Sequence, residues 1–115
     1  MAMKYEAAED EDLTTALRAL AHPARLSILR ILSRNGTSAC CCNDVAECLP
    51  LAQSTVSQHI KVLLDAGLIE RKPRGTRNCY LVRADRLAKT ELAITDFFKS
   101  LGVSETARTE LSESA

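Results

Sequence analysis

Three consecutive cysteines, Cys40, Cys41 and Cys42, are the residues of this chain whose type and spacing could most readily do chemistry. Thiolates are soft ligands that prefer thiophilic ions, and neighbouring thiols can also be oxidised reversibly. Apolar packing seldom uses three thiols in succession, so we interpret the run as a site for a soft ion or for thiol redox chemistry. The remaining cysteines, Cys48 and Cys79, lie within apolar patterns, where we expect small core residues.

The cellular compartment decides how five cysteines are interpreted. The acidic stretch from Met1 to Asp12 lacks the basic and apolar segments of a signal peptide. No apolar run approaches the roughly 20 residues that span a bilayer. We therefore expect a cytoplasmic protein with no membrane partner. In that reducing environment a structural disulfide framework is not expected, and an odd number of thiols favours metal or redox chemistry.

A second set of polar residues, between positions 53 and 61, has the composition of a DNA-reading helix face. The opposite face of this helix is apolar at steps of three and four, at Val56, Ile60, Leu63 and Leu64. Small hydroxyls let a helix approach the major groove, amides pair with base edges, and lysine meets phosphate. His59 flanks the apolar stripe and could pack, contact phosphate or read a base. The expected DNA contacts on this helix are Gln53, Ser54, Thr55, Ser57, Gln58, His59 and Lys61.

Charge is unevenly distributed although the formal net charge is zero, with 15 basic and 15 acidic residues. The first dozen residues are acidic, whereas seven basic residues face three acidic ones between positions 53 and 86. This concentration of positive charge suits a phosphate backbone, although a merely solvated basic hairpin is the alternative. We expect backbone contacts from Lys72, Arg74 and Arg77.

The elements that must position these residues follow from apolar periodicity and from turn signals. A helix beginning at Pro23 should end at Asn35-Gly36, and Gly67 should stop the proposed reading helix. Besides the helix that begins at Pro23, the sequence predicts helices over residues 12–21, 44–49, 53–65 and 84–101. It also predicts two strands, over residues 68–71 and 80–82, joined by a turn at residues 73–78.

This order predicts a mainly α-helical fold with a small β-hairpin, a winged helix-turn-helix. With 46% hydrophobic but only 3% aromatic residues, the core must be aliphatic. We divide the chain into a flexible acidic N-terminus (residues 1–11), a DNA-binding and dimerisation domain (12–101) and a polar, frayed C-terminal tail (102–115).

The chain resembles the ArsR/SmtB family over about residues 12–100. The resemblance lies in residues 51–60 (LAQSTVSQHI), in residues 66–69 (AGLI) with the basic hairpin ending at Tyr80, and in residues 20–29 (LAHPARLSIL). It implies a homodimeric repressor that binds an inverted-repeat operator and leaves it when an inducer binds. It also implies that the first and last helices form the dimer interface.

Two positions depart from the family pattern. The family often has a serine that caps the reading helix where this chain has Ala52, so that helix end must be ordered differently. Arsenic-responsive members have a motif similar to Cys-Val-Cys-Asp-Leu at the start of the short helix. Matching that motif at Asp44-Val45 puts Cys41 on its first cysteine and Asn43 on its second, so the thiol positions are only partly kept.

The backbone around the thiol run could take two forms. If Asn43 caps the short helix, all three cysteines lie in the preceding loop and can wrap around an ion; if the helix begins at Ser38, ligation must distort its first turn. Zinc sites of the family in the last helix need histidine, and that helix has none. An all-sulfur site favours As(III) or Sb(III), then Cd(II), Pb(II) or another soft cation.

Three other interpretations compete with a soft-ion-responsive repressor. A thiol redox or reactive-sulfur sensor is the main alternative, but redox members of the family generally place one cysteine in the last helix, where this chain has none. A constitutive architectural DNA-binding protein leaves the cysteine run unexplained. An enzyme is disfavoured because neither a nucleophile with its base nor a cofactor loop is recognisable.

Overall fold

The computed structural model describes residues 7–34, 40–103 and 105–114; within these ranges, residues 7–9, 40–44, 105, 106, 108, 113 and 114 are described by their backbone alone. Mostly helical, with a short sheet, it confirms the predicted fold class. The elements are α1 (Ala7–Leu20), α2 (Pro23–Arg34), β1 (Cys40–Cys41), α3 (Cys42–Glu47), α4 (Gln53–Asp65), β2 (Ile69–Arg74), β3 (Arg77–Val82), α5 (Ala84–Ser100) and α6 (Glu105–Ser114).

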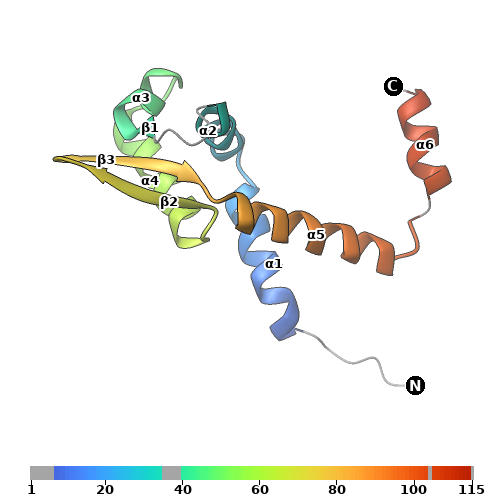
Figure 1. Cartoon of the computed structure of the whole chain (residues 1–115). Coiled ribbons are helices and arrows are strands. Elements are labelled where there is room, and N and C mark those ends of the chain that lie inside the picture. Colours follow the sequence, from blue (N-terminus) through green and yellow to red (C-terminus); the bar gives the residue numbers. More distant parts are fainter. Residues whose placement is uncertain (1–6, 35–39, 104, 115) are drawn as a thin grey trace.

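The core is aliphatic, as expected, and lies where α2, α3 and α4 meet the base of the hairpin. Ile28 and Leu32 of α2 and Val45 of α3 are fully or almost fully buried. They pack with the apolar face of α4 and with Leu68, Ile69 and Tyr80 at the sheet. Packing of α3 and α2 on α4 fixes the helix-turn-helix. Figure 1 shows α3, α4 and the hairpin at one end of the molecule.

The sheet has three strands in the order β1-β3-β2, one more than the hairpin predicted from the sequence. β2 and β3 pair antiparallel from Ile69 opposite Val82 to Arg74 opposite Arg77, so both strands are longer than expected. Gly75, with φ of +62°, is the first residue of the two-residue turn between them. A type II′ turn requires a positive φ at this first position, which glycine readily adopts. β1 pairs antiparallel with the free side of β3, which places the cysteine run against the wing.

Gly67 converts the end of α4 into the start of the wing. Its φ is +76°, the left-handed conformation that glycine adopts without steric cost. The Gly67 amide donates to the Leu64 carbonyl and the Leu68 amide to the Leu63 carbonyl, which together form a Schellman motif. This cap directs the chain from α4 into β2.

Three element boundaries differ from the sequence-based expectation. α1 begins at Ala7 rather than at residue 12, because alanines and an acidic first turn favour an earlier helix start. The tail expected to be frayed contains α6. α3 begins at Cys42, so the backbone shows neither a short helix capped by Asn43 nor one that already includes Cys40 and Cys41. Residues 1–6 of the predicted flexible start, the Asn35-Gly36 stop and Ser38 lie outside the described residues.

α5 projects from the rest of the fold (Figure 1). α5 has 17 residues and contacts α1. None of these 17 residues is buried within the protomer. The Cα radius of gyration is 17.2 Å, against the roughly 13 Å of a compact chain of this length. Within the described residues, no helix is both long and apolar enough to cross a bilayer.

Candidate DNA interface and thiol site

The two faces of α4 are divided as the sequence predicts. Val56, Ile60 and Leu63 are buried at 2% exposure or less. Thr55 and His59 are partly buried, whereas the rest of the predicted reading set is exposed, namely Gln53, Ser54, Ser57, Gln58 and Lys61. Five of the seven predicted reading residues therefore lie on the solvent-facing side of one helix.

The N-terminus of α4 is ordered without a side-chain cap. Ala52 occupies the N-cap in an extended conformation, and no side-chain hydrogen bond caps the helix. Its carbonyl accepts the first intrahelical bond from the Val56 amide at 3.0 Å. The backbone alone therefore orders this end of the helix, which is the end that a winged helix-turn-helix inserts into the major groove.

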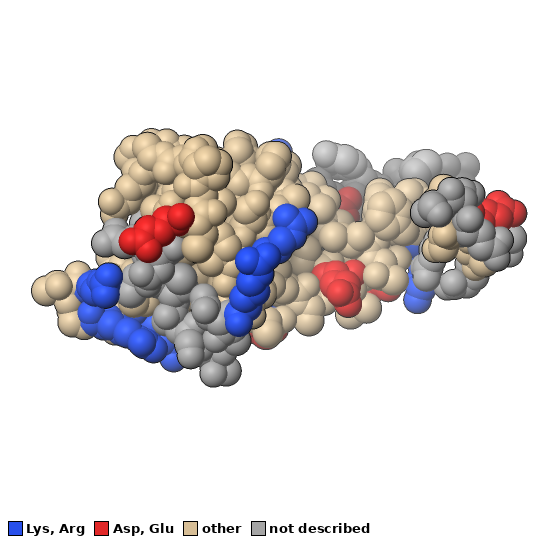
Figure 2. Space-filling view, turned by 90° about the horizontal axis from the view of Figure 1, so that it is seen from above, with Lys and Arg blue, Asp and Glu red and all other residues tan. Residues whose placement is uncertain are grey.

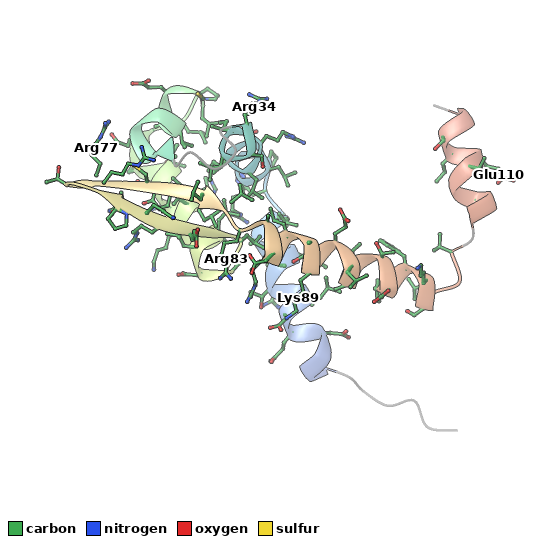
Figure 3. All side chains as sticks on the ribbon, in the orientation of Figure 1. Arg34, Arg77, Arg83, Lys89 and Glu110 are labelled. Atoms are coloured by element: carbon green, nitrogen blue, oxygen red, sulfur yellow. The ribbon has the colours of Figure 1, made fainter. Side chains whose placement is uncertain are left out.

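The wing presents the predicted phosphate-binding residues to solvent. Lys72 and Arg74 of β2 and Arg77 of β3 are all exposed. Figure 3 shows Arg77 extending from the hairpin near its far end, and Figure 2 shows basic side chains at the hairpin end of the molecule. At the base of the hairpin, Arg83 forms an ion pair with Asp85 at 2.9 Å, so its charge is partly neutralised within the chain.

Arg25 of α2 ties the reading helix to the end of α1. Its guanidinium donates to the carbonyls of Ala19, at 2.6 Å, and Arg18, at 3.0 Å. A further guanidinium nitrogen lies 3.2 Å from Nδ1 of His59. Because a guanidinium only donates, that Nδ1 must be the accepting nitrogen of a neutral ring. His59 therefore faces the interior junction of α1, α2 and α4, the packing interpretation among those open from the sequence.

His22 completes this junction and was not singled out by the sequence as a structural residue. It accepts a hydrogen bond from the Ala24 amide at 3.0 Å and so caps the first turn of α2. Its ring centroid lies 4.3 Å from that of His59. Partial burial, with further contributions from His22 and the Arg25 cation, lowers the pKa of His59 below its usual 6.5.

The cysteine run does not form a loop. Cys40 and Cys41 form β1, which is paired with β3, and Cys42 is the first residue of α3. The expectation of three cysteines in a loop is wrong, because strand pairing to the wing satisfies the backbone there. The side chains of Cys40, Cys41 and Cys42 lie outside the described part of the structure, so their assignment as ligands stays a prediction.

The two other cysteines have different environments. Cys48 follows the end of α3 and is an exposed free thiol, which corrects its assignment to the core. Cys79 lies in β3 and is fully buried, as expected, but it is disulfide-bonded, contrary to the expectation that the thiols stay reduced. Among residues with described side chains, no group of three or more His, Cys, Asp or Glu could hold a metal ion.

Comparison with known proteins identifies the same fold and function class. A family model described as a helix-turn-helix domain matches residues 20–72. The chain is 37% identical over 84 residues to the uncharacterized HTH-type transcriptional regulator MJ1325 of Methanocaldococcus jannaschii, covering 73% of this chain and 86% of that protein. It is 40% identical over 63 residues to the arsenical resistance operon repressor of Bacillus subtilis, covering 55% of this chain and 58% of that repressor.

A solved structure supports the winged fold independently. The homodimeric winged helix-turn-helix DNA-binding domain Mb0332 of Mycobacterium bovis, described as a possible ArsR-family transcriptional regulator, superposes with a TM-score of 0.65. The two chains are 23% identical, and the match covers 91% of this chain and 97% of that one. The likeness shows a shared winged helix-turn-helix fold.

The lowered pKa of His59 predicts a pH-dependent stability. The unfolded chain binds a proton at this ring more readily than the folded chain, so the stabilisation is complete above pH 6.5 and is lost as the pH falls through the folded-state pKa. We expect the wild-type melting temperature to decrease between about pH 7.5 and about pH 5.5, a range around the ordinary histidine pKa. His59→Gln, which keeps an acceptor for Arg25 but does not titrate, should flatten this dependence. Equal pH profiles of the two proteins would contradict the assignment.

Proposed function

The chain belongs to the ArsR family of winged-helix transcriptional regulators, and from this premise we propose that it is a homodimeric cytoplasmic repressor released from its operator by a thiophilic inducer. It is a DNA-binding regulator and not an enzyme, as are the proteins it matches. The observation that carries the proposal is the position of the cysteine run, which continues directly into α3 and therefore into the helix-turn-helix. A ligand on these thiols acts on the element that positions α4.

The proposed DNA interface combines α4 with the wing. Ser57 and Gln58 lie on the exposed face of α4, where a hydroxyl and an amide can reach base edges in the major groove. Arg74 and Arg77 flank the turn of the wing and supply positive charge for the phosphate backbone. One reading helix contacts too few bases for useful specificity, so we expect a dimer on an inverted repeat.

Substitution can separate base reading from phosphate binding. Ser57→Ala combined with Gln58→Ala should lower discrimination between operator and unrelated DNA, because a good bidentate contact contributes roughly 1–3 kcal/mol of selectivity. Arg74→Ala combined with Arg77→Ala should weaken binding to all duplexes alike and reduce the salt dependence. Both are measured by fluorescence anisotropy over a salt series. Intact discrimination in the Ser57/Gln58 variant would show that the reading face is wrongly assigned.

The proposed dimer forms through α1 and α5. α5 carries large apolar side chains but buries none within the protomer. Leu92 is 62% exposed, Phe97 46% and Phe98 49%, and Leu17 of α1 is 41% exposed. Figure 1 shows α5 running away from the end of the molecule that holds α3, α4 and the hairpin, so a dimer can form without covering α4. The homodimeric state of the similar Mycobacterium bovis domain supports a dimer, and the exposed apolar residues of α1 and α5 are what favour these helices as its interface.

A charge on α5 should dissociate the dimer. Phe98→Glu places a carboxylate on the proposed apolar interface, where burying an unpaired charge is costly, so the variant should sediment as a monomer and bind operator weakly. Leu111→Glu is the matched control, because Leu111 is 73% exposed but lies on α6, outside the interface. A Phe98→Glu variant that stays dimeric at the wild-type concentration range would exclude α5 from the interface.

For the inducer we propose As(III) or Sb(III), with Cd(II) or Pb(II) as the next candidates. The chemistry of the donors fits, since Cys40, Cys41 and Cys42 offer only sulfur, the ligand that these soft species prefer. The two histidines do not compete for this role, because His22 and His59 contact each other and Arg25 at the junction of α1, α2 and α4. Similarity to the Bacillus subtilis arsenical resistance repressor supports the same choice.

The route from the thiols to DNA is short. Val45, three residues after Cys42, is fully buried and anchors α3 in the core cluster that also contains Val56 of α4. A bound inducer that rearranges the first turn of α3 therefore strains the packing of α3 on α4. Coupling of about 1–3 kcal/mol between the sites would change operator affinity roughly 5- to 150-fold.

Replacing the thiol run tests the inducer. The Cys40→Ser/Cys41→Ser/Cys42→Ser variant should bind operator but no longer dissociate when arsenite is added, as followed by anisotropy. Cys48→Ser, at an exposed free thiol outside the run, is the control and should respond like wild type. Full arsenite-induced release in the triple variant would contradict the assignment of the run as the inducer site.

A redox-sensing repressor is the second candidate, favoured by the disulfide at Cys79. In this mechanism oxidation of thiols to a disulfide, rather than ligation of an ion, changes the wing. Titration of the operator complex distinguishes the two mechanisms. A redox sensor should be released by peroxide, whereas an arsenite-specific repressor should be released by arsenite under reducing conditions.

A further inference from the structure

We propose that Cys79 of the wing supplies a sulfur ligand to the inducer site, so that the soft ion is held between β1 and β3 by Cys41 and Cys79, with Cys42 as the third ligand. This inference rests on the proposed function and refines its ligand set. The cysteine run is then only half of the site, and the other half is the DNA-contacting hairpin itself.

The register of the sheet carries the first step. Cys41 lies directly opposite Cys79 in the antiparallel pair of β1 and β3. Directly opposed residues of antiparallel strands share one face of the sheet and have Cα atoms about 4.5–5.5 Å apart. That spacing lies within the roughly 4.4–6.8 Å over which two cysteines can join their sulfurs. The fold thus places two cysteines from distant parts of the sequence at one sheet position.

The same register separates Cys40 from this pair. Successive residues of a strand face opposite sides of a sheet, so Cys40, which is opposite Tyr80, belongs to the other face. Three consecutive cysteines in extended backbone could not converge on one ion by themselves. Cys42 follows at the first residue of α3, where the strand geometry ends and the chain turns.

Cys79 has a property that a simple core cysteine lacks. Its side chain is fully buried, and its sulfur is bonded to another sulfur, whereas Cys48 is an exposed free thiol. Two sulfurs that can form a disulfide can also bind one soft ion, once the disulfide is reduced and the two sulfurs move slightly apart. The burial would also shield such a site from water and from competing oxygen ligands.

The ion-binding step requires the reduced thiols. A dithiol reductant first exchanges with the disulfide at Cys79: the two thiols of the reductant are oxidised to its own disulfide, and the protein disulfide is reduced to two thiols. Arsenous acid then forms one arsenic–sulfur bond with each of three thiols. Each thiol proton leaves with one hydroxyl group as water, and arsenic remains trivalent. The disulfide state and the ion-bound state therefore exclude each other.

With this ligand set, the inducer is bonded directly to a strand of the wing. Lys72 lies opposite Cys79 on the other side of β3, and Arg77 is two residues from it along the strand. Movement of β3 toward β1 therefore displaces the cations proposed to meet phosphate. Ion binding should reduce the salt dependence of residual DNA binding as well as its affinity.

Two-cysteine variants test the pair without altering the buried residue. Phenylarsine oxide, a trivalent arsenical that takes two thiolates, is the probe, and intact mass with a count of remaining thiols is the readout. After reduction, the Cys40→Ser/Cys42→Ser/Cys48→Ser variant, which keeps Cys41 and Cys79, should form a one-to-one adduct that consumes both thiols. The matched Cys41→Ser/Cys42→Ser/Cys48→Ser variant, which keeps Cys40 and Cys79, should bind far more weakly. Prior oxidation of the first variant should prevent its adduct.

Single substitutions complete the test with arsenite. Cys79→Ala should weaken arsenite binding, followed by arsenic–sulfur absorbance, by more than the roughly 10- to 100-fold that loss of an outer-shell partner costs. Cys48→Ala, at the exposed free thiol outside the site, should bind as wild type does. Equal adducts in the two paired variants, or wild-type arsenite affinity in folded Cys79→Ala, would overturn the role of Cys79 while leaving the proposed function intact. A wild-type protein that binds no arsenite would instead contradict the proposed function.

Discussion

Burial of one face of α4 is the constraint on which the rest of the structure depends. Val56, Ile60 and Leu63 must leave water, and they do so against α2, α3 and the base of the hairpin. A helix that buries one face presents the other, so core packing and the exposure of Ser57 and Gln58 are two results of one periodicity. The wing is positioned by the same helix, because the Gly67 cap sends the chain from α4 directly into β2.

The junction around Arg25 holds this reading helix against α1 and α2. One guanidinium contacts the last carbonyls of α1 and the ring of His59 on α4, so three helices share one polar anchor at the edge of an aliphatic core. In a chain whose aromatic residues make up only 3%, such a directional contact adds orientation that packing of Leu, Ile and Val alone specifies poorly. It also links the orientation of α4 to the helix that faces α5.

The three-stranded sheet connects the thiols with the DNA-contacting wing. If β1 were a loop, an event at the cysteines would reach DNA only through α3 and its buried anchor Val45. Pairing of β1 with β3 adds a second mechanical connection, across a single ladder of hydrogen bonds, to the strand that carries Arg77. Both connections begin at Cys41 and Cys42, so a small rearrangement there acts on the reading helix and the wing together.

The sequence by itself determined the local elements and their faces. Apolar spacing of three and four with Pro23 and Gly67 as boundaries predicted α2, α4 and α5 closely, because helix hydrogen bonds and amphipathicity are local. Tertiary structure alone decided three features: the pairing of β1 with β3, the exposure of Cys48, and the turning of His59 toward Arg25. Strand register depends on residues far apart in the chain, so no local pattern could show that Cys41 lies opposite Cys79. The identity of the neighbours, rather than the residue types, then determines which thiols can act together.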